Sequence, residues 1–110
     1  MITSMDRESV REAYEEVRNN LCDNEWAVFK FDSTEIICAA KGIGFDDFQQ
    51  QFMDDERAFG YIRIAMGDEM SKRSKFLFLT WIGCDVGVMQ RAKMSTDKSL
   101  MKEVISVSFN

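Results

Sequence analysis

The amino-acid sequence predicts an α/β protein of the α+β type, in which a mixed central β-sheet is sandwiched between helices. Three patterns lead to this prediction: an amphipathic helix near the start, two pairs of strand-like segments, and a nearly continuous apolar run over residues 76–82. The chain has 110 residues, of which 45% are apolar, with no linker or repeat. We therefore expect one globular domain over residues 1–110.

The first helix is predicted by an apolar stripe that recurs at helical spacing. Its members are Val10, Ala13, Tyr14, Val17 and Leu21. Asp6 is expected to cap the N-terminus of this helix, with Met5 packing back onto Val10. The helix should end near Asn19 and Asn20, because Asn tolerates the left-handed conformation.

A hairpin and a short helix should follow. Residues 25–31 and 35–40 are strand-like, and the turn-prone segment Asp32-Ser33-Thr34 separates them. Gly42 and Gly44 then interrupt the pattern. Behind them Phe45, Phe48 and Phe52 recur at helical spacing, which predicts a short helix whose aromatic side chains belong to the core.

Residues 57–66 and 76–82 predict a second hairpin. The chain turns at Gly67-Asp68-Glu69, and the basic segment 71–75 forms the hairpin tip. The run 76–82 is apolar at consecutive positions, which is typical of a strand covered on both faces. We therefore expect this strand in the middle of the sheet.

The last helix carries most of the basic residues. At 100° per residue, Arg91, Lys98 and Lys102 share one stripe, and the opposite side, expected to face the core, holds Met89, Leu100 and Val104. Lys93 falls on that core side. Either its side chain extends past the core to solvent, or the chain bends and a new helix is capped around residues 95–97. We favour the bend.

The charge is unevenly distributed. Residues 71–102 contain seven Lys and Arg against Asp85 and Asp97, a net of +5, although the whole chain carries -5. If the fold brings the hairpin tip and the last helix together, they form one patch that attracts an anionic partner. Alternatively, these charges only solvate a loop and a helix face.

Several function classes are disfavoured by the composition. The chain has no His, and its three Cys are widely spaced without a C-x-x-C motif, so we expect no disulfide framework, metal site or cofactor. No Gly-rich phosphate loop occurs, and the acidic clusters suit helix starts and turns, so we do not expect an enzyme. The negative net charge argues against nucleic-acid binding. With no long apolar run or leader, we expect a cytoplasmic protein.

Four blocks of sequence resemble coactosin, the small filament-binding branch of the actin-depolymerising-factor homology (ADF-H) domains. They are Asp54-Asp55-Glu56-Arg57-Ala58-Phe59, Gly67-Asp68-Glu69-Met70-Ser71-Lys72-Arg73-Ser74-Lys75-Phe76, Thr80-Trp81-Ile82-Gly83 and Gln90-Arg91-Ala92-Lys93-Met94-Ser95-Thr96-Asp97-Lys98-Ser99-Leu100. The resemblance runs without an obvious gap from Met5 to about Ile105. It implies an ADF-H, gelsolin-like fold.

The resemblance also implies a function: binding to the side of filamentous actin, without catalysis and in opposition to capping of filament ends. The residues that match the family's filament-contacting hairpin tip are Lys72, Arg73 and Lys75, with Lys75 the foremost. Arg91 and Lys93 match the basic pair that related domains place against actin. Lys98 and Lys102 are added from the charge stripe alone.

Further expectations concern the alternative function, competing ligands, the end of the chain and the oligomeric state. A cofilin-like role in binding actin monomers and severing or depolymerising filaments is the alternative function, and phosphoinositide headgroups could compete for the same cations. The family's domain normally continues after the long helix with another strand and a C-terminal helix, which this sequence lacks. A monomer is expected for the family, whereas this short form, with an exposed strand edge, is expected to associate with itself.

Overall fold

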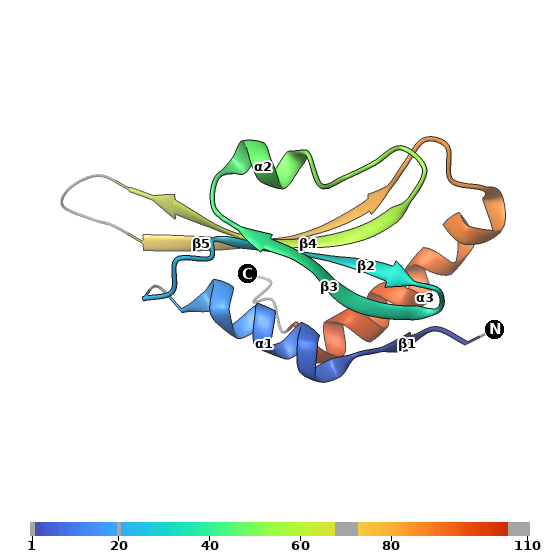
Figure 1. Cartoon of the computed structure of the whole chain (residues 1–110), viewed down its shortest axis with the longest axis horizontal. Coiled ribbons are helices and arrows are strands. Elements are labelled where there is room, and N and C mark those ends of the chain that lie inside the picture. The colour runs from blue at the N-terminus through green and yellow to red at the C-terminus, as the bar shows by residue number, and fades with distance from the viewer. Residues whose placement is uncertain (1, 20, 68–72, 106–110) are drawn as a thin grey trace.

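The computed structural model describes residues 2–19, 21–67 and 73–105, and for Met66 and Arg73 it describes the backbone alone. Its elements are β1 (Ser4–Met5), α1 (Arg7–Arg18), β2 (Trp26–Asp32), β3 (Glu35–Gly42), α2 (Phe45–Gln49), β4 (Arg57–Met66), β5 (Arg73–Ile82) and α3 (Val88–Val104). The strands form one sheet in the order β1-β3-β2-β4-β5. The predicted mixed sheet between helices is confirmed, because α1 and α3 cover one face and α2 covers the other (Figure 1).

Both predicted hairpins are present. β2 pairs antiparallel with β3 and β4, and β4 pairs antiparallel with β5 from Arg57 opposite Ile82 to Met66 opposite Arg73. β1, which the sequence pattern did not predict, pairs parallel with β3 and makes the sheet mixed. β1 has only two residues, which are too few to show the alternation of apolar and polar side chains that predicts a strand.

The strand buried on both faces is β2. Trp26 and Val28 belong to the apolar cluster beneath α2, whereas Ala27 and Phe29 belong to the cluster beneath α1 and α3. All four side chains are at most 3% exposed. The prediction that the run 76–82 lies mid-sheet is wrong, since β5 is an edge strand of the described sheet. Its apolar residues occupy both faces, but those on the α2 face remain partly exposed.

Helix α1 begins as predicted. The structure after its end, however, corrects the prediction for one residue, Leu21. The Asp6 carboxylate accepts a hydrogen bond from the Ser9 amide at 3.2 Å. The helix ends at Arg18, and Asn19 is extended with φ of -84° rather than left-handed. Leu21 therefore leaves the helical stripe and is 94% exposed, so its assignment to the core was wrong.

The phenylalanine segment is confirmed as a short helix, but it is less buried than predicted. Phe48 is 3% exposed, whereas Phe45 is 55% exposed at the start of α2. Phe52 lies beyond the helix and packs edge-on against Phe48, with ring centroids 5.0 Å apart. This one helix is too short to cover its face of the sheet.

Helix α3 runs unbroken through residues 95–97, so the predicted bend with a new cap there is wrong. Its buried residues are Met94, Asp97 and Met101, whereas Met89, predicted to face the core, is 79% exposed. The prediction counted only apolar side chains, and the buried Asp97 shifts the core-facing stripe by roughly a quarter turn.

The Asp6 cap gives a direct test of the helix start. We expect Asp6→Ala to lower the free energy of unfolding by about 1 kcal/mol, because the Ser9 amide loses its acceptor. Urea denaturation followed by circular dichroism measures this difference. Asp6→Asn keeps a side-chain oxygen and should lose little; equal losses in both variants would contradict the assignment.

Candidate functional site

The hairpin end of the β4–β5 pair is the first predicted basic region. Lys75 is exposed on β5 and lies opposite Ile64. Arg73 is the first residue of β5, and Lys72 lies outside the described residues. Strand alternation places Lys75 on the same face as Leu77 and Leu79, which is the face that α2 partly covers.

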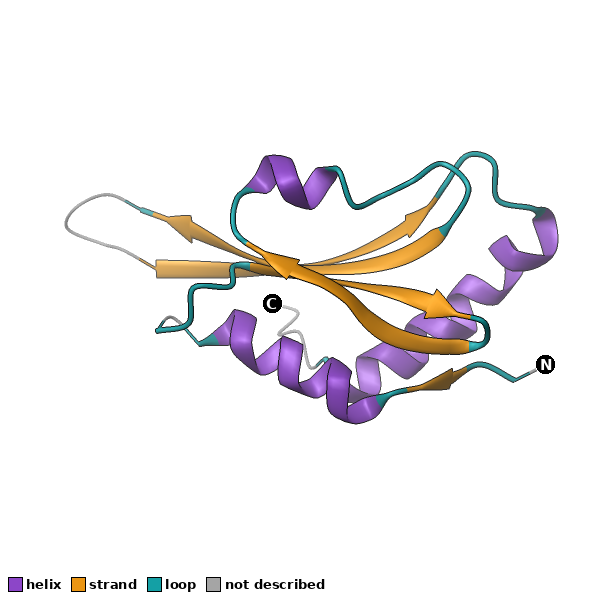
Figure 2. Cartoon of the chain, in the orientation of Figure 1, coloured by secondary structure: helices purple, strands orange, loops and turns teal. Residues whose placement is uncertain are grey.

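Arg91, at the start of α3, holds the loop that connects β5 to the helix. Its guanidinium donates hydrogen bonds to the carbonyl oxygens of Val86, Gly83 and Cys84, at 3.1, 3.2 and 3.3 Å. Two backbone hydrogen bonds join this loop to the α2–β4 loop, from Gly83 to Glu56 and from Asp85 to Asp54, so the loops lie side by side (Figure 2). Arg91 is thus an exposed cation with a structural task.

Gly83 is required where these two loops meet. A Cβ atom at this position would lie 2.2 Å from the Asp54 carbonyl oxygen, which no side chain could tolerate without a backbone shift. The glycine that ends the sequence block Thr80-Trp81-Ile82-Gly83 is therefore explained by packing. It lets the loop before α3 approach the sheet end closely.

Lys93 lies in a polar pocket of about 350 Å³ between the N-terminal segment, the β2–β3 turn and α3. The pocket is lined by Thr3, Phe31, Ser33, Thr34, Arg57, Gln90 and Lys93. Lys93 is half-buried, as expected for a side chain that extends along the core toward solvent. Of the two alternatives, the one without a bend is therefore the correct one.

A buried ion pair beside this pocket was not predicted. Arg57 Nη1 lies 2.7 Å from Asp97 Oδ2, and the side chains of the two residues are only 10% and 2% exposed. The Arg57 guanidinium carbon also lies 4.0 Å from the centroid of the Phe31 ring. The sequence offered one signal, since Asp97 stands three residues after Met94 and four before Met101, on their face of the helix.

The remaining predicted cations lie farther along α3. Lys98 is half-buried and Lys102 is exposed, and because the helix is continuous they share one stripe with Arg91. Along β5, Lys75 is about 23 Å from Ile82, and Arg91 lies beyond that end of the strand. The structure therefore places Lys75 and the start of α3 toward opposite ends of a molecule with extents of 50 × 26 × 25 Å (Figure 1). One patch was expected only if the fold brought the hairpin tip and the last helix together, and the described cations Lys75 and Arg91 do not meet that condition.

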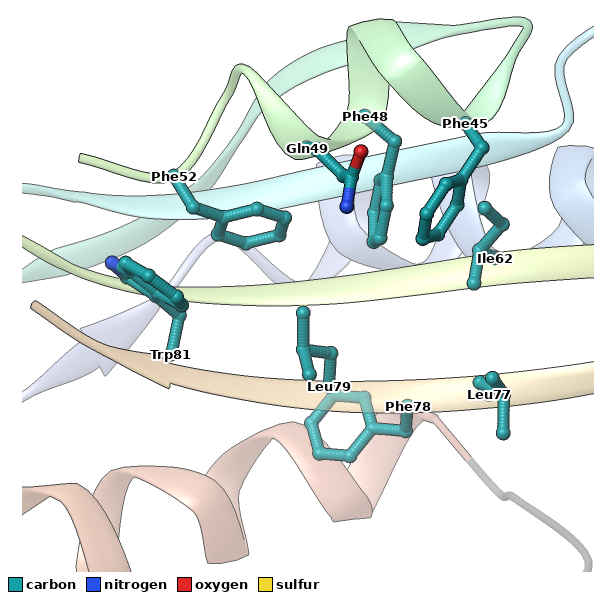
Figure 3. A pocket seen from close by; sticks show the side chains of 9 residues that line it. All are labelled: Phe45, Phe48, Gln49, Phe52, Ile62, Leu77, Phe78, Leu79 and Trp81. Carbon is teal, nitrogen blue, oxygen red and sulfur yellow. The ribbon is translucent and has the colours of Figure 1, made fainter.

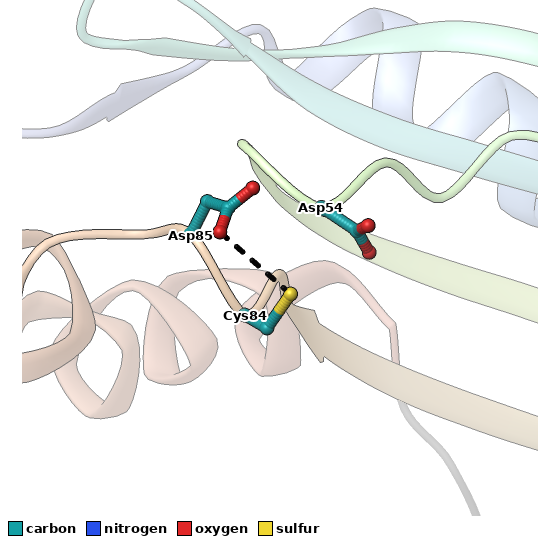
Figure 4. A group of neighbouring side chains, drawn as sticks. All are labelled: Asp54, Cys84 and Asp85. Carbon is teal, nitrogen blue, oxygen red and sulfur yellow. Dashed lines mark hydrogen bonds between the residues drawn. The ribbon is translucent and has the colours of Figure 1, made fainter.

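Asp54, Cys84 and Asp85 form an exposed group at the end of β5 (Figure 4). One ligand atom from each lies within 4.8 Å of the others. Asp54 and then Asp85 raise the pKa of the Cys84 thiol, because their negative charges oppose formation of the thiolate. A protonated thiol is a poor ligand and nucleophile, so this group offers little metal or redox chemistry. All three cysteines are free, as predicted.

An apolar groove of about 510 Å³ opens between α2 and β5 (Figure 3). It is lined by Phe45, Phe48, Gln49, Phe52, Ile62, Leu77, Phe78, Leu79 and Trp81. The indole of Trp81 donates to the Met53 carbonyl oxygen at 2.7 Å, which fixes the ring at one end of the groove. Sequence reasoning assigned the three phenylalanines to the core and the run 76–82 to a strand covered on both faces, and so missed the groove.

Comparison with known proteins gives the class of the protein. A sequence model of the cofilin/tropomyosin-type actin-binding proteins matches residues 3–110, and the chain belongs to this family. Within it, the chain is 47% identical to the coactosin-like protein of Bos taurus over 105 residues, which cover 96% of this chain and 74% of that protein. It is 37% identical to coactosin of Dictyostelium discoideum over 99 residues, covering 87% and 68% of the two chains.

Solved structures agree. The crystal structure of human coactosin-like protein superposes with a TM-score of 0.90 at 45% identity, covering 94% of this chain and 79% of that one. Mouse coactosin, described as an actin filament binding protein, gives a TM-score of 0.78 at 46% identity, covering 94% and 73%. The resemblance to coactosin is confirmed. Among the described residues, no helix is long and apolar enough to cross a membrane.

The buried ion pair yields a second prediction. Asp97→Ala should lower the free energy of unfolding by about 3–5 kcal/mol, because it leaves the Arg57 charge buried without its partner. Glu103→Ala on the same helix removes an exposed pair with Arg7 and should cost less than about 1 kcal/mol. Urea denaturation of both variants tests this, and similar losses would contradict the importance assigned to burial.

A third prediction concerns the thiol. Asp54→Asn should lower the pKa of Cys84, so that alkylation by iodoacetamide becomes faster at a given pH below that pKa. The measurement is the pH profile of the alkylation rate in a chain with Cys22→Ser and Cys38→Ser. Asp55→Asn is the neighbouring control, and an unshifted profile in Asp54→Asn would refute the electrostatic explanation.

Proposed function

We propose that this protein binds the side of actin filaments through its two basic regions, without catalysis. The observation that carries the proposal is family membership over residues 3–110, together with 46% identity to a mouse coactosin described as an actin filament binding protein. The residues proposed to contact the filament are Lys72, Arg73, Lys75, Arg91, Lys93, Lys98 and Lys102. Such a protein works at the actin cytoskeleton of the cytoplasm.

The separation of the two regions favours an extended partner. Lys75 and Lys93 lie toward opposite ends of the molecule, whose longest extent is 50 Å. A small globular ligand could not meet both at once, whereas the flank of a filament is a long acidic surface. Binding through two regions would also obstruct proteins that cap filament ends.

The individual cations have different roles in this proposal. Lys75 is exposed on a strand and can meet a carboxylate directly. Arg91 contributes charge but chiefly fixes the loop before α3, since its guanidinium already donates to three carbonyl oxygens. Lys93 lines a pocket together with the hydroxyl groups of Thr3, Ser33 and Thr34, which would accompany it in binding an acidic side chain. Lys98 and Lys102 would add long-range attraction along the helix.

The fourth prediction tests this function by co-sedimentation with filamentous actin at low and high salt. Wild-type protein should pellet with filaments and pellet less as salt increases, because screening weakens exposed charge pairs. Lys75→Ala should weaken binding about tenfold, equivalent to about 1.4 kcal/mol. Lys41→Ala removes a lysine already paired with Glu16 at 2.7 Å and should leave pelleting unchanged. A folded wild-type chain that stays in the supernatant would contradict the proposal.

Filament binding and a cofilin-like activity can be separated in the same system. The matched family includes the cofilins, so monomer binding with severing or depolymerisation is the second candidate. A side-binding protein enriches the pellet without shortening filaments, whereas a severing protein increases the number of ends seen by fluorescence microscopy. Vesicles containing phosphoinositides should compete for the same cations and reduce pelleting.

A further inference from the structure

The β4–β5 hairpin extends past β2 and β3 (Figure 1). β2 pairs with β4 no farther than Trp26 opposite Ile62. One more backbone hydrogen bond follows, in which the Arg63 amide donates to the Glu25 carbonyl oxygen at 2.8 Å. β4 continues to Met66, and in the part of the chain that the structure describes no strand lies beside it on the β2 side past Arg63. A two-stranded ribbon is only marginally stable by itself, so the direction of this hairpin depends on contacts at its base.

Arg63 joins the base of this hairpin to the end of α1. Its Nη1 atom donates hydrogen bonds to the carbonyl oxygens of Val17 at 2.7 Å and Asn19 at 2.8 Å. Its Nη2 atom donates to the carbonyl oxygen of Cys22 at 3.2 Å, in the loop after the helix. Carbonyl oxygens at the end of a helix lack partners within the helix and carry partial negative charge, so a guanidinium group is well suited to bind them. Because its donors are rigidly arranged, these three acceptors fix the position of β4 relative to α1.

Arg18, the last residue of α1, makes the reciprocal contact with the hairpin. Its guanidinium carbon lies 4.8 Å from the centroid of the Phe76 ring on β5, and its Nη1 atom donates to the Tyr61 hydroxyl at 3.2 Å. The rings of Tyr61 and Phe76 are stacked, with centroids 5.8 Å apart. Phe76 lies directly opposite Arg63, and Lys75 is the next residue of β5 toward the tip. Arg18 and Arg63, the arginine pair, therefore hold both strands of the hairpin one residue before Lys75.

We propose that Arg18 and Arg63 are positioning residues for filament binding: they hold the base of the β4–β5 hairpin against the end of α1 and so fix where Lys75 is presented. The inference rests on the proposed function, in which Lys75 is the foremost filament contact. Neither arginine needs to touch the filament, since both guanidinium groups already bind groups of the protein itself. Without the arginine pair the hairpin would sample several directions, and the free energy of ordering it would be lost from binding.

The test is co-sedimentation of the full chain with filamentous actin, with the folding of each variant checked by circular dichroism. Arg63→Lys keeps the positive charge, but an ammonium group on a flexible stem does not hold three carbonyl oxygens in one rigid arrangement. It should weaken filament binding about fivefold, because the hairpin must then be ordered on binding. Arg11→Lys makes the same change at an exposed position of α1 and should leave binding unchanged. Equal affinities of Arg63→Lys and the wild-type protein would overturn the proposal.

Coupling to Lys75 separates positioning from a general effect on stability. In a chain that already carries Lys75→Ala, Arg63→Lys should cause no further loss of filament binding, since the side chain that Arg63 positions is gone. The full loss in this background would overturn the proposal, because Arg63 would then act independently of Lys75. A wild-type chain that does not pellet overturns the proposed function and this inference with it, whereas a coupling test that fails in a chain that pellets overturns the inference alone.

The mobility of the hairpin gives a second measurement, made without actin. A spin label attached through Ala65→Cys, in a chain whose three cysteines are replaced by serine, lies past the arginine pair on an exposed position of β4. Arg63→Lys and Arg18→Met should both make this label more mobile, because each loosens the base of the hairpin. Arg11→Met removes a cation from the same helix and should leave the label as it is in the wild-type chain. Unchanged mobility in Arg63→Lys and Arg18→Met would overturn the proposal.

Discussion

The arrangement of α3 depends on one buried ion pair, between Arg57 at the start of β4 and Asp97 in the middle of the helix. An unpaired charge in either place would be strongly unfavourable, so the pair selects the rotation of α3 that brings the two side chains together. That rotation turns Met94 and Met101 into the core and leaves Lys93 beside the polar pocket. The ion pair between Arg57 and Asp97 therefore positions the basic side chains of α3, although none of them takes part in it.

Arginine side chains also fix the loops around the sheet. Arg91 donates to three carbonyl oxygens of the loop before α3, and Arg63 donates to the carbonyl oxygens of Val17, Asn19 and Cys22 at the end of α1. Guanidinium groups suit this task because their donors are several and rigidly arranged. Charge counted from sequence thus overstates the cations available to a partner, since part of it stabilises loop ends.

The sequence predicted most of the fold because the spacing of apolar residues and the positions of turn residues indicate the same elements in α1 and in both hairpins. It failed where a polar residue is buried or an apolar one is exposed. Asp97 was interpreted as a cap, which misplaced the core face of α3. Leu77 and Leu79 suggested a central strand, although β5 is an edge strand of the sheet that the described residues form. For the candidate site, residue type and resemblance identified the cations, but only the three-dimensional arrangement could show that Lys75 and Arg91 are far apart.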